Sequence, residues 1–243
     1  MLDADRSGYV DIHSHILPNL DDGPATLEGS LDLAKEAVAN GISDIIATPH
    51  LNRDLFPFST NASRQACKQL QEALAAADIP LKLHLGAEVK IHPKIVEELN
   101  AGKVPMLAES RYLLLELPFD MIPPYAHEIV FQMRLAGVTP ILAHPERNAS
   151  IQRDPRKLGA LIDLGCLTQI NSTSLTGRLG EASQSTAVSM LTQGWAHMIG
   201  SDSHFAGDRG PNFKEAITVA AKYVGFDEAQ KLVRENPKRL LEN

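Results

Sequence analysis

Short apolar segments alternate with longer amphipathic segments along the whole chain. The apolar segments have the length of β-strands and cover 9–15, 42–48, 81–88, 112–117, 138–144, 167–171 and 196–201. The amphipathic segments repeat apolar residues every three or four positions, as helices do. They cover 62–77, 93–101, 124–136, 155–164, 181–193 and 213–223, with a further helix after Gly225. The first helix carries Leu27, Leu31, Ala34 and Val38, and Gly41 ends it.

Seven strands that are each followed by a helix predict parallel βαβ units, either closed into a barrel or left as an open wound sheet. The sequence shows no internal repeat or linker, so we expect one domain over residues 1–243. The least regular segment, 51–61, is expected to be a packed surface loop, with a lid over a site as the alternative.

Composition limits the class of protein. The net charge is −7 and no run of Lys or Arg occurs, which makes nucleic acid a poor partner. No stretch reaches the roughly 18 apolar residues of a membrane span, and residues 1–8 lack the apolar region of a signal peptide. The 2 cysteines are too few for a disulfide framework. We expect a cytoplasmic enzyme, and the oligomeric state stays open.

Histidines and carboxylates gather where the predicted strands end. In parallel α/β folds these carboxyl ends form the functional face. Six of the seven strands end in or beside such a residue, and unpartnered groups of this kind are costly to bury. We therefore predict a metal site with the ligands His13, His15, Asp22, His50, Glu88, Glu116, His144, Asp202 and His204.

The number and type of these ligands indicate the ions. Nine donors exceed what one ion of four to six ligands accepts, so we expect two or three divalent ions. Imidazole and carboxylate without thiolate suit Mn, Fe or Zn. Three such ions would outweigh the four carboxylates in charge, and the positive pocket that results makes a phosphate ester the natural substrate. Arg147 and Arg209 lie close to ligands in the sequence and are expected to bind phosphate oxygens. The remaining histidines, His84, His92, His127 and His197, are expected to lie away from the site.

The chain contains, in this order, the strings DIHSHILPNLDDGP at 11–24, IIATPH at 45–50, GAEV at 86–89, LLLELPF at 113–119, PILAHPERN at 140–148 and GSDSH at 200–204. These strings resemble those of the PHP (polymerase and histidinol phosphatase) superfamily of metal-dependent phosphoesterases. Within it, the chain is similar to the bacterial protein-tyrosine phosphatases of the capsule and exopolysaccharide type. The similarity covers nearly all of the chain after an N-terminal extension of residues 1–8.

This resemblance implies a distorted (β/α)7 PHP barrel with the metal site at the carboxyl ends of the strands. It implies the same nine ligands, with manganese as the expected ion, and Arg147 and Arg209 as the residues that contact phosphate. It also implies a substrate, phosphotyrosine on a bacterial tyrosine autokinase that regulates polysaccharide synthesis.

Other activities remain open from the sequence. They are hydrolysis of a small phosphomonoester such as histidinol phosphate, an amidohydrolase reaction, nuclease activity, and a binding module that has lost catalysis. A cysteine-dependent phosphatase is excluded, because that mechanism needs Arg six residues after the cysteine. Ala73 and Ser172 stand there after Cys67 and Cys166. The general acid is not identified; Asp21 and a water molecule are the two candidates.

Overall fold

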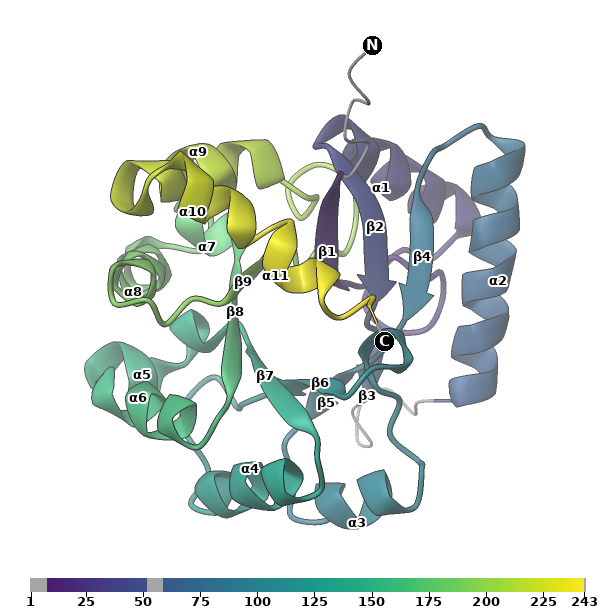
Figure 1. The fold of residues 1–243 in the computed structure, drawn as a ribbon. Coiled ribbons are helices and arrows are strands. Elements are labelled where there is room, and N and C mark those ends of the chain that lie inside the picture. Colours follow the sequence, from purple (N-terminus) through teal and green to yellow (C-terminus); the bar gives the residue numbers. More distant parts are fainter. Residues whose placement is uncertain (1–7, 52–58, 243) are drawn as a thin grey trace.

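The strands form two parallel sheets that together make a distorted barrel (Figure 1). The computed structural model describes residues 8–51 and 59–242, and the statements that follow concern these residues. The strands are β1 (Tyr9–Ser14), β2 (Ile42–Ala47), β3 (His50–Leu51), β4 (Lys82–Leu85), β5 (Glu88–Lys90), β6 (Tyr112–Glu116), β7 (Thr139–Ala143), β8 (Leu167–Asn171) and β9 (Met198–Gly200). One sheet has the order β1-β2-β4, and the other has the order β3-β5-β6-β7-β8-β9.

The chain closes the barrel by passing two segments from one sheet to the other. β2 continues into β3, and β4 continues into β5. The predicted strand 42–48 matches β2, whereas the predicted strand 81–88 is interrupted between β4 and β5. On the other side, a parallel bridge joins Ser14 to Ser203, and the amide of His15 donates to the Ser203 carbonyl over 2.8 Å. The expected distorted (β/α)7 barrel is therefore confirmed, and the open wound sheet is wrong.

The break between β4 and β5 lies at a glycine. A Cβ atom on Gly86 would lie 2.7 Å from Cδ2 of Leu107 and 3.1 Å from Cγ2 of Ile46. Leu107 begins the 3-10 helix η1 (Leu107–Glu109), which packs against the strand here. Only glycine allows this close approach. The predicted strand 81–88 is interrupted at this position.

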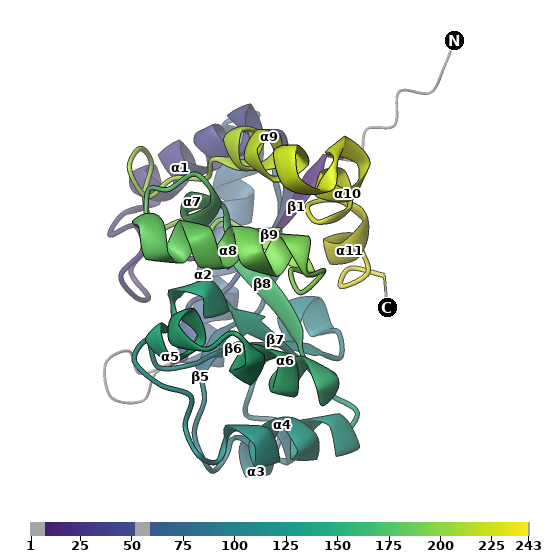
Figure 2. The ribbon, with the colours of Figure 1, turned by 90° about the vertical axis from the view of Figure 1, so that its left-hand side faces the viewer.

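Helices surround the strands, as Figures 1 and 2 show. They are α1 (Leu27–Ala39), α2 (Thr60–Ala76), α3 (Ile95–Asn100), α4 (Ala126–Leu135), α5 (Ala149–Arg153), α6 (Arg156–Asp163), α7 (Ser172–Leu175), α8 (Glu181–Thr192), α9 (Phe213–Val224), α10 (Phe226–Lys231), α11 (Glu235–Lys238) and the 3-10 helix η2 (Pro145–Arg147). The predicted helices are present within a few residues. The expected terminal helix is divided into α10 and α11, and the short helices α5 and α7 were not predicted. None of the described helices has the length and apolar character needed to cross a bilayer.

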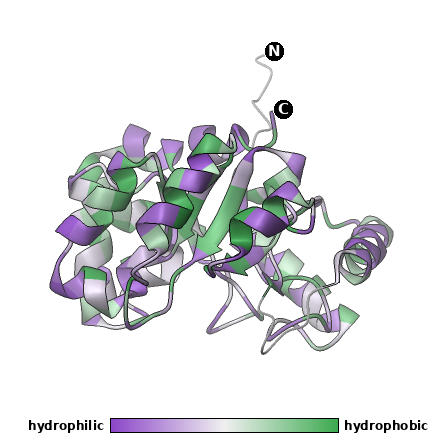
Figure 3. Cartoon of the chain, turned by 90° about the horizontal axis from the view of Figure 1, so that it is seen from below, coloured by the Kyte–Doolittle hydropathy of each residue, from purple (hydrophilic) through white to green (hydrophobic). Residues whose placement is uncertain are grey.

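The hydrophobic core has two parts, one between the strands and the helices and a smaller one inside the barrel. In Figure 3 the strands are mainly hydrophobic, whereas the helices carry both kinds of residue. Leu240, which is buried, joins Val10 and Ile12 in the smaller cluster. The amide of Val10 donates to the Val233 carbonyl over 2.9 Å, so the C-terminal segment covers the amino ends of the strands. This segment does not cover the carboxyl ends of the strands, where a functional site is expected.

Candidate metal centre

The nine predicted ligands converge at the carboxyl ends of the strands. His13 lies in β1, His50 in β3, Glu88 in β5 and Glu116 at the end of β6. The other five lie in segments that follow strands: His15, Asp22, His144, Asp202 and His204. A cavity of about 480 Å³ opens above them. Its lining includes Asp22, His50, Glu88, Glu116, His144, Asp202 and His204, together with Arg147 and Arg209. His13 and His15 are buried beneath it.

Sharp backbone turns bring two of these residues into the cavity. His144 has φ 34° and Asp202 has φ 51°, both in the left-handed region. Residues other than glycine adopt this conformation at a cost of about 1–3 kcal/mol, and such strain is concentrated at functional sites. Each turn lies where a strand ends, after β7 and after β9. The strained backbone at these two turns directs the side chains of His144 and Asp202 into the cavity.

Glu88 occupies the centre of the buried part of the site. Its Oε2 lies 3.4 Å from Nε2 of His13, 3.5 Å from Nε2 of His15 and 2.9 Å from Nδ1 of His50. Its Oε1 lies 3.0 Å from Nε2 of His144. Oε2 is buried and accepts no hydrogen bond of good geometry from the described residues, despite the three nearby nitrogens. A buried carboxylate oxygen of this kind needs a cation, which fits a metal ligand.

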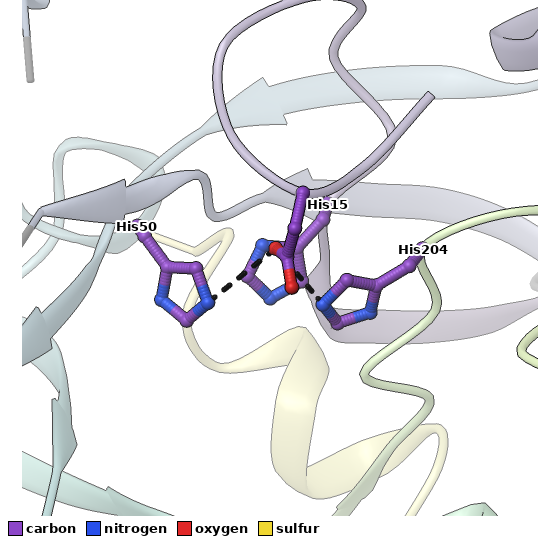
Figure 4. A group of neighbouring side chains, drawn as sticks. His15, His50 and His204 are labelled. Atoms are coloured by element: carbon purple, nitrogen blue, oxygen red, sulfur yellow. Dashed lines mark ion pairs between the residues drawn. The ribbon is translucent and has the colours of Figure 1, made fainter. Parts of the chain in front are cut away.

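The potential ligand atoms form three overlapping groups, each with atoms within 4.8 Å of one another. One comprises His15, Asp22, His50 and His204, and Figure 4 shows that its three imidazoles converge. The second comprises His13, His15 and Glu88, and the third His50, Glu88 and Glu116. Because His15, His50 and Glu88 each belong to two groups, the arrangement suits adjacent ions that share ligands.

The charges of the site are strongly coupled. Burial is the strongest influence on Glu88 and would raise its pKa, but His13 and its other imidazole neighbours outweigh burial and hold the pKa well below its ordinary value. Burial and the charge of Glu88 together raise the pKa of Glu116. Burial lowers the pKa of His13, but Glu88 and Asp202 outweigh it and raise that pKa to about 9. Without a metal ion, protonated imidazoles such as that of His13 therefore balance the charge of Glu88.

Three residues outside the predicted ligand set hold predicted ligands in place. Oε1 of Gln169 lies 2.8 Å from Nδ1 of His13, and Nδ2 of Asn171 donates to Oδ2 of Asp202 over 2.7 Å. Both residues lie in β8, the one predicted strand that supplies no ligand. Neither residue was predicted, because an amide side chain gives no metal-binding signal in the sequence.

Asp21 is the third supporting residue. Its Oδ2 lies 2.7 Å from Nδ1 of His15 and accepts from the amide of His50 over 2.9 Å. Burial would raise the pKa of Asp21, but His15 and two backbone amides outweigh it and lower that pKa. An ionised carboxylate with three hydrogen bonds is a poor proton donor, so the geometry favours support of His15 over general acid catalysis.

The two predicted phosphate-binding arginines lie beside ligands. Nη1 of Arg147 donates to Oδ2 of Asp202 over 2.8 Å, and its Cζ lies 4.5 Å from the ring centroid of Phe119. Nη2 of Arg209 lies 2.9 Å from the imidazole nitrogens of His204. Both guanidinium groups therefore reach the cavity. Phe119 lines the cavity as well and was not predicted.

The remaining histidines and both cysteines lie elsewhere. His84 contacts Asp44, His92 contacts Glu98, His127 is exposed, and His197 accepts from the amide of Thr168. Cys67 and Cys166 are free thiols. Most of the segment 51–61, for which a loop or a lid was expected, and nearly all of the extension 1–8 lie outside the described residues.

Comparisons with known proteins agree with these observations. The family described as "Capsular polysaccharide synthesis, CpsB/CapC" matches residues 9–242. The tyrosine-protein phosphatase YwqE of Bacillus subtilis strain 168 is 36% identical over 234 residues, which cover 96% of this chain and 92% of that protein. The crystal structures of YwqE from Bacillus subtilis and CpsB from Streptococcus pneumoniae are described as unique metal-dependent tyrosine phosphatases. One chain from them matches with TM-score 0.93 and 36% identity, and covers 96% of this chain and 94% of its own length.

A more distant structural match shows the fold alone. Histidinol phosphate phosphatase from Lactococcus lactis subsp. lactis Il1403 matches with TM-score 0.56 and 14% identity, over 91% of this chain and 94% of its own. At this level of identity the similarity does not transfer the substrate.

Proposed function

This chain belongs to the capsular polysaccharide synthesis family CpsB/CapC, and on that basis we infer that it is a metal-dependent protein-tyrosine phosphatase. The match of the whole barrel to metal-dependent tyrosine phosphatases supports this activity over hydrolysis of a small phosphomonoester. Of the observations at the site, one carries the proposal. Oε2 of Glu88 is a buried carboxylate oxygen that has imidazole nitrogens within 2.9 to 3.5 Å but accepts no hydrogen bond of good geometry from the described residues.

We propose that the nine predicted ligands hold two or three divalent ions, with manganese as the physiological metal. Their imidazole and carboxylate groups suit Mn, and the three overlapping groups of donors support more than one ion. Bound divalent ions supply the Lewis acidity and the activated water that hydrolysis of a phosphate ester requires.

The protein's own residues orient the substrate and hold the ligands. Arg147 and Arg209 line the cavity, and their planar guanidinium groups suit the non-bridging oxygens of a phosphoryl group. Gln169, Asp21 and Asn171 fix the orientation of His13, His15 and Asp202 respectively. The tyrosine leaving group has a pKa of about 10, so its departure needs less proton donation than that of an alkyl alcohol.

The proposed physiological substrate is phosphotyrosine on a bacterial tyrosine autokinase that regulates capsular or exopolysaccharide synthesis, and the proposed location is the cytoplasm. The family's role in capsular polysaccharide synthesis supports the first part. The free state of both cysteines is consistent with a reducing compartment.

Phosphate release from a phosphotyrosyl peptide, from a phosphorylated tyrosine autokinase and from histidinol phosphate tests the proposal. We expect Mn-dependent release from the first two, and its loss when a chelator is added. Activity confined to histidinol phosphate would retain the metal centre but overturn the tyrosine phosphatase function. Activity on the peptide without activity on the kinase would overturn only the proposed partner.

A further inference from the structure

A third arginine lies on the cavity, apart from the two beside the ligands. Arg178 and its neighbour Leu179 line the cavity from the turn that joins α7 to α8. Apart from the nine predicted ligands, the charged side chains of the described lining are three arginines and Asp208. When metal ions balance the carboxylates of the predicted ligands, the remaining charged side chains would give the cavity an excess of positive charge, although the whole chain has a net charge of −7.

The turn that carries Arg178 has a defined conformation. Gly177 and Gly180 have φ 81° and 89°, which residues with side chains rarely adopt. The amide of Arg178 donates to the Thr173 carbonyl over 3.0 Å, and the Gln184 side chain donates to the Leu175 carbonyl over 3.0 Å. The backbone therefore holds Arg178 at a fixed place on the cavity.

The guanidinium of Arg178 is independent of the metal centre. Whereas Arg147 and Arg209 contact ligands, Nη2 of Arg178 donates to Oε2 of Glu215 in α9 over 2.8 Å. The two side chains of this pair are 43% and 53% exposed. Exposed ion pairs contribute only about 0–1 kcal/mol to stability, so an incoming anion can replace Glu215 at little cost.

The cavity also offers apolar contacts beyond the metal ligands. Phe119 and Leu179 line it and are 46% and 40% exposed, so both side chains are accessible to a ligand. Cavities of several hundred Å³ accommodate a ligand much larger than a phosphoryl group. The apolar side chains of Phe119 and Leu179 suit the aromatic ring of a phosphotyrosine. Arg178 would then contact a residue next to that phosphotyrosine.

We propose that Arg178 forms a second anion-binding subsite, which binds a carboxylate or phosphate on a residue next to the phosphotyrosine. This inference rests on the proposed function and narrows its substrate class to tyrosine segments with a neighbouring negative charge. Glu215 holds the guanidinium in place until the substrate anion takes over that contact.

Three peptides that share one phosphotyrosine test the subsite. The first has neutral neighbours, the second has acidic neighbours, and the third has a second phosphotyrosine. The kcat/KM of each peptide is measured for the wild type, for Arg178→Gln and for Arg178→Lys. Arg156→Gln is the matched control, because Arg156 is 90% exposed and also pairs with one carboxylate, that of Asp154. Circular dichroism and metal content confirm that each variant is folded and loaded.

We expect the wild type to prefer an anionic neighbour, and Arg178→Gln to reduce that preference about five- to tenfold, chiefly through KM. Arg178→Lys should restore part of it, because lysine keeps the charge but loses the planar fork. If Arg178→Gln lowers kcat/KM only for the doubly phosphorylated peptide, the subsite binds phosphate. If it lowers kcat/KM for both anionic peptides, the subsite also binds carboxylate. An unchanged preference in Arg178→Gln would overturn the subsite alone. Failure of the wild type to hydrolyse all three peptides would overturn the proposed function, and this inference with it.

Discussion

His50 and Glu88 are direct partners across β3 and β5, and Nδ1 of His50 lies 2.9 Å from Oε2 of Glu88. They are 38 residues apart in the sequence. Because the two strands are parallel and in register here, both side chains reach the same edge of the sheet. Glu88 also faces His13, His15 and His144, so one carboxylate connects the donors from several strands.

Replacement of Glu88 tests the metal centre directly. Glu88→Gln removes the charge but keeps the shape, so we expect loss of bound metal and at least about a hundredfold lower kcat. Metal content by mass spectrometry and phosphate release measure the two effects. Glu97→Gln is the control, since Glu97 is exposed in α3. Full metal content and activity in Glu88→Gln would remove Glu88 from the ligand set.

Asp21→Asn separates ligand support from proton donation. If Asp21 orients His15, its loss should weaken metal affinity about 10- to 100-fold, and excess Mn should restore activity. A general acid could not be replaced in this way. Activity titrated against Mn concentration distinguishes the two roles, and a low activity that saturating Mn does not raise would support the general acid.

Arg147→Ala and Arg209→Ala should each lower kcat/KM by about 30- to 1,000-fold, because each removes a charge-assisted contact to the phosphoryl group. Bound metal should stay constant, which distinguishes these variants from Glu88→Gln. Inhibition by inorganic phosphate should weaken in parallel. Wild-type kinetics in either variant would exclude that arginine from phosphate binding.

The two cysteines should be dispensable for activity. Burial raises the pKa of Cys166 to about 12 and also raises the pKa of Cys67, so neither is a ready thiolate. The double variant Cys67→Ser, Cys166→Ala should keep its kcat and lose about 1–2 kcal/mol of stability, mainly at the buried Cys166. Loss of turnover in the folded double variant would contradict a metal-dependent mechanism.

The metal-free protein should lose stability at alkaline pH. Burial lowers the pKa of His13, but Glu88 and Asp202 outweigh it and raise that pKa from 6.5 to about 9. Protonated His13 therefore stabilises the metal-free fold fully below pH 6.5, and this contribution disappears as the pH rises through about 9.

Urea unfolding at a series of pH values, with chelator and with Mn, measures this effect. The free energy of unfolding should fall between pH 6.5 and 9 only in the chelated protein, because bound ions replace the proton's charge. His13→Gln should reduce the dependence in chelator. An equal decline in the wild type with and without Mn would refute the explanation.

The order of strands and helices and the residue types of the site follow from local patterns in the sequence. Apolar segments of strand length and helical periodicity predicted parallel βαβ units, and parallel strands align their carboxyl ends whatever the details of packing. Donors placed at those ends, such as His50 and His144, therefore had to lie near one another. The class of ligand followed from residue type alone.

The identity of the supporting residues and the closure of the barrel depend on packing between distant segments. Gln169 contacts His13 across 156 positions of sequence, and this contact depends on the curvature of the barrel. The left-handed turns at His144 and Asp202 are set by the surrounding packing, because both residues disfavour that conformation on their own. The surrounding packing likewise sets the position of Arg178 at the cavity. Side-chain convergence over such separations depends on the whole fold, which local sequence patterns do not encode.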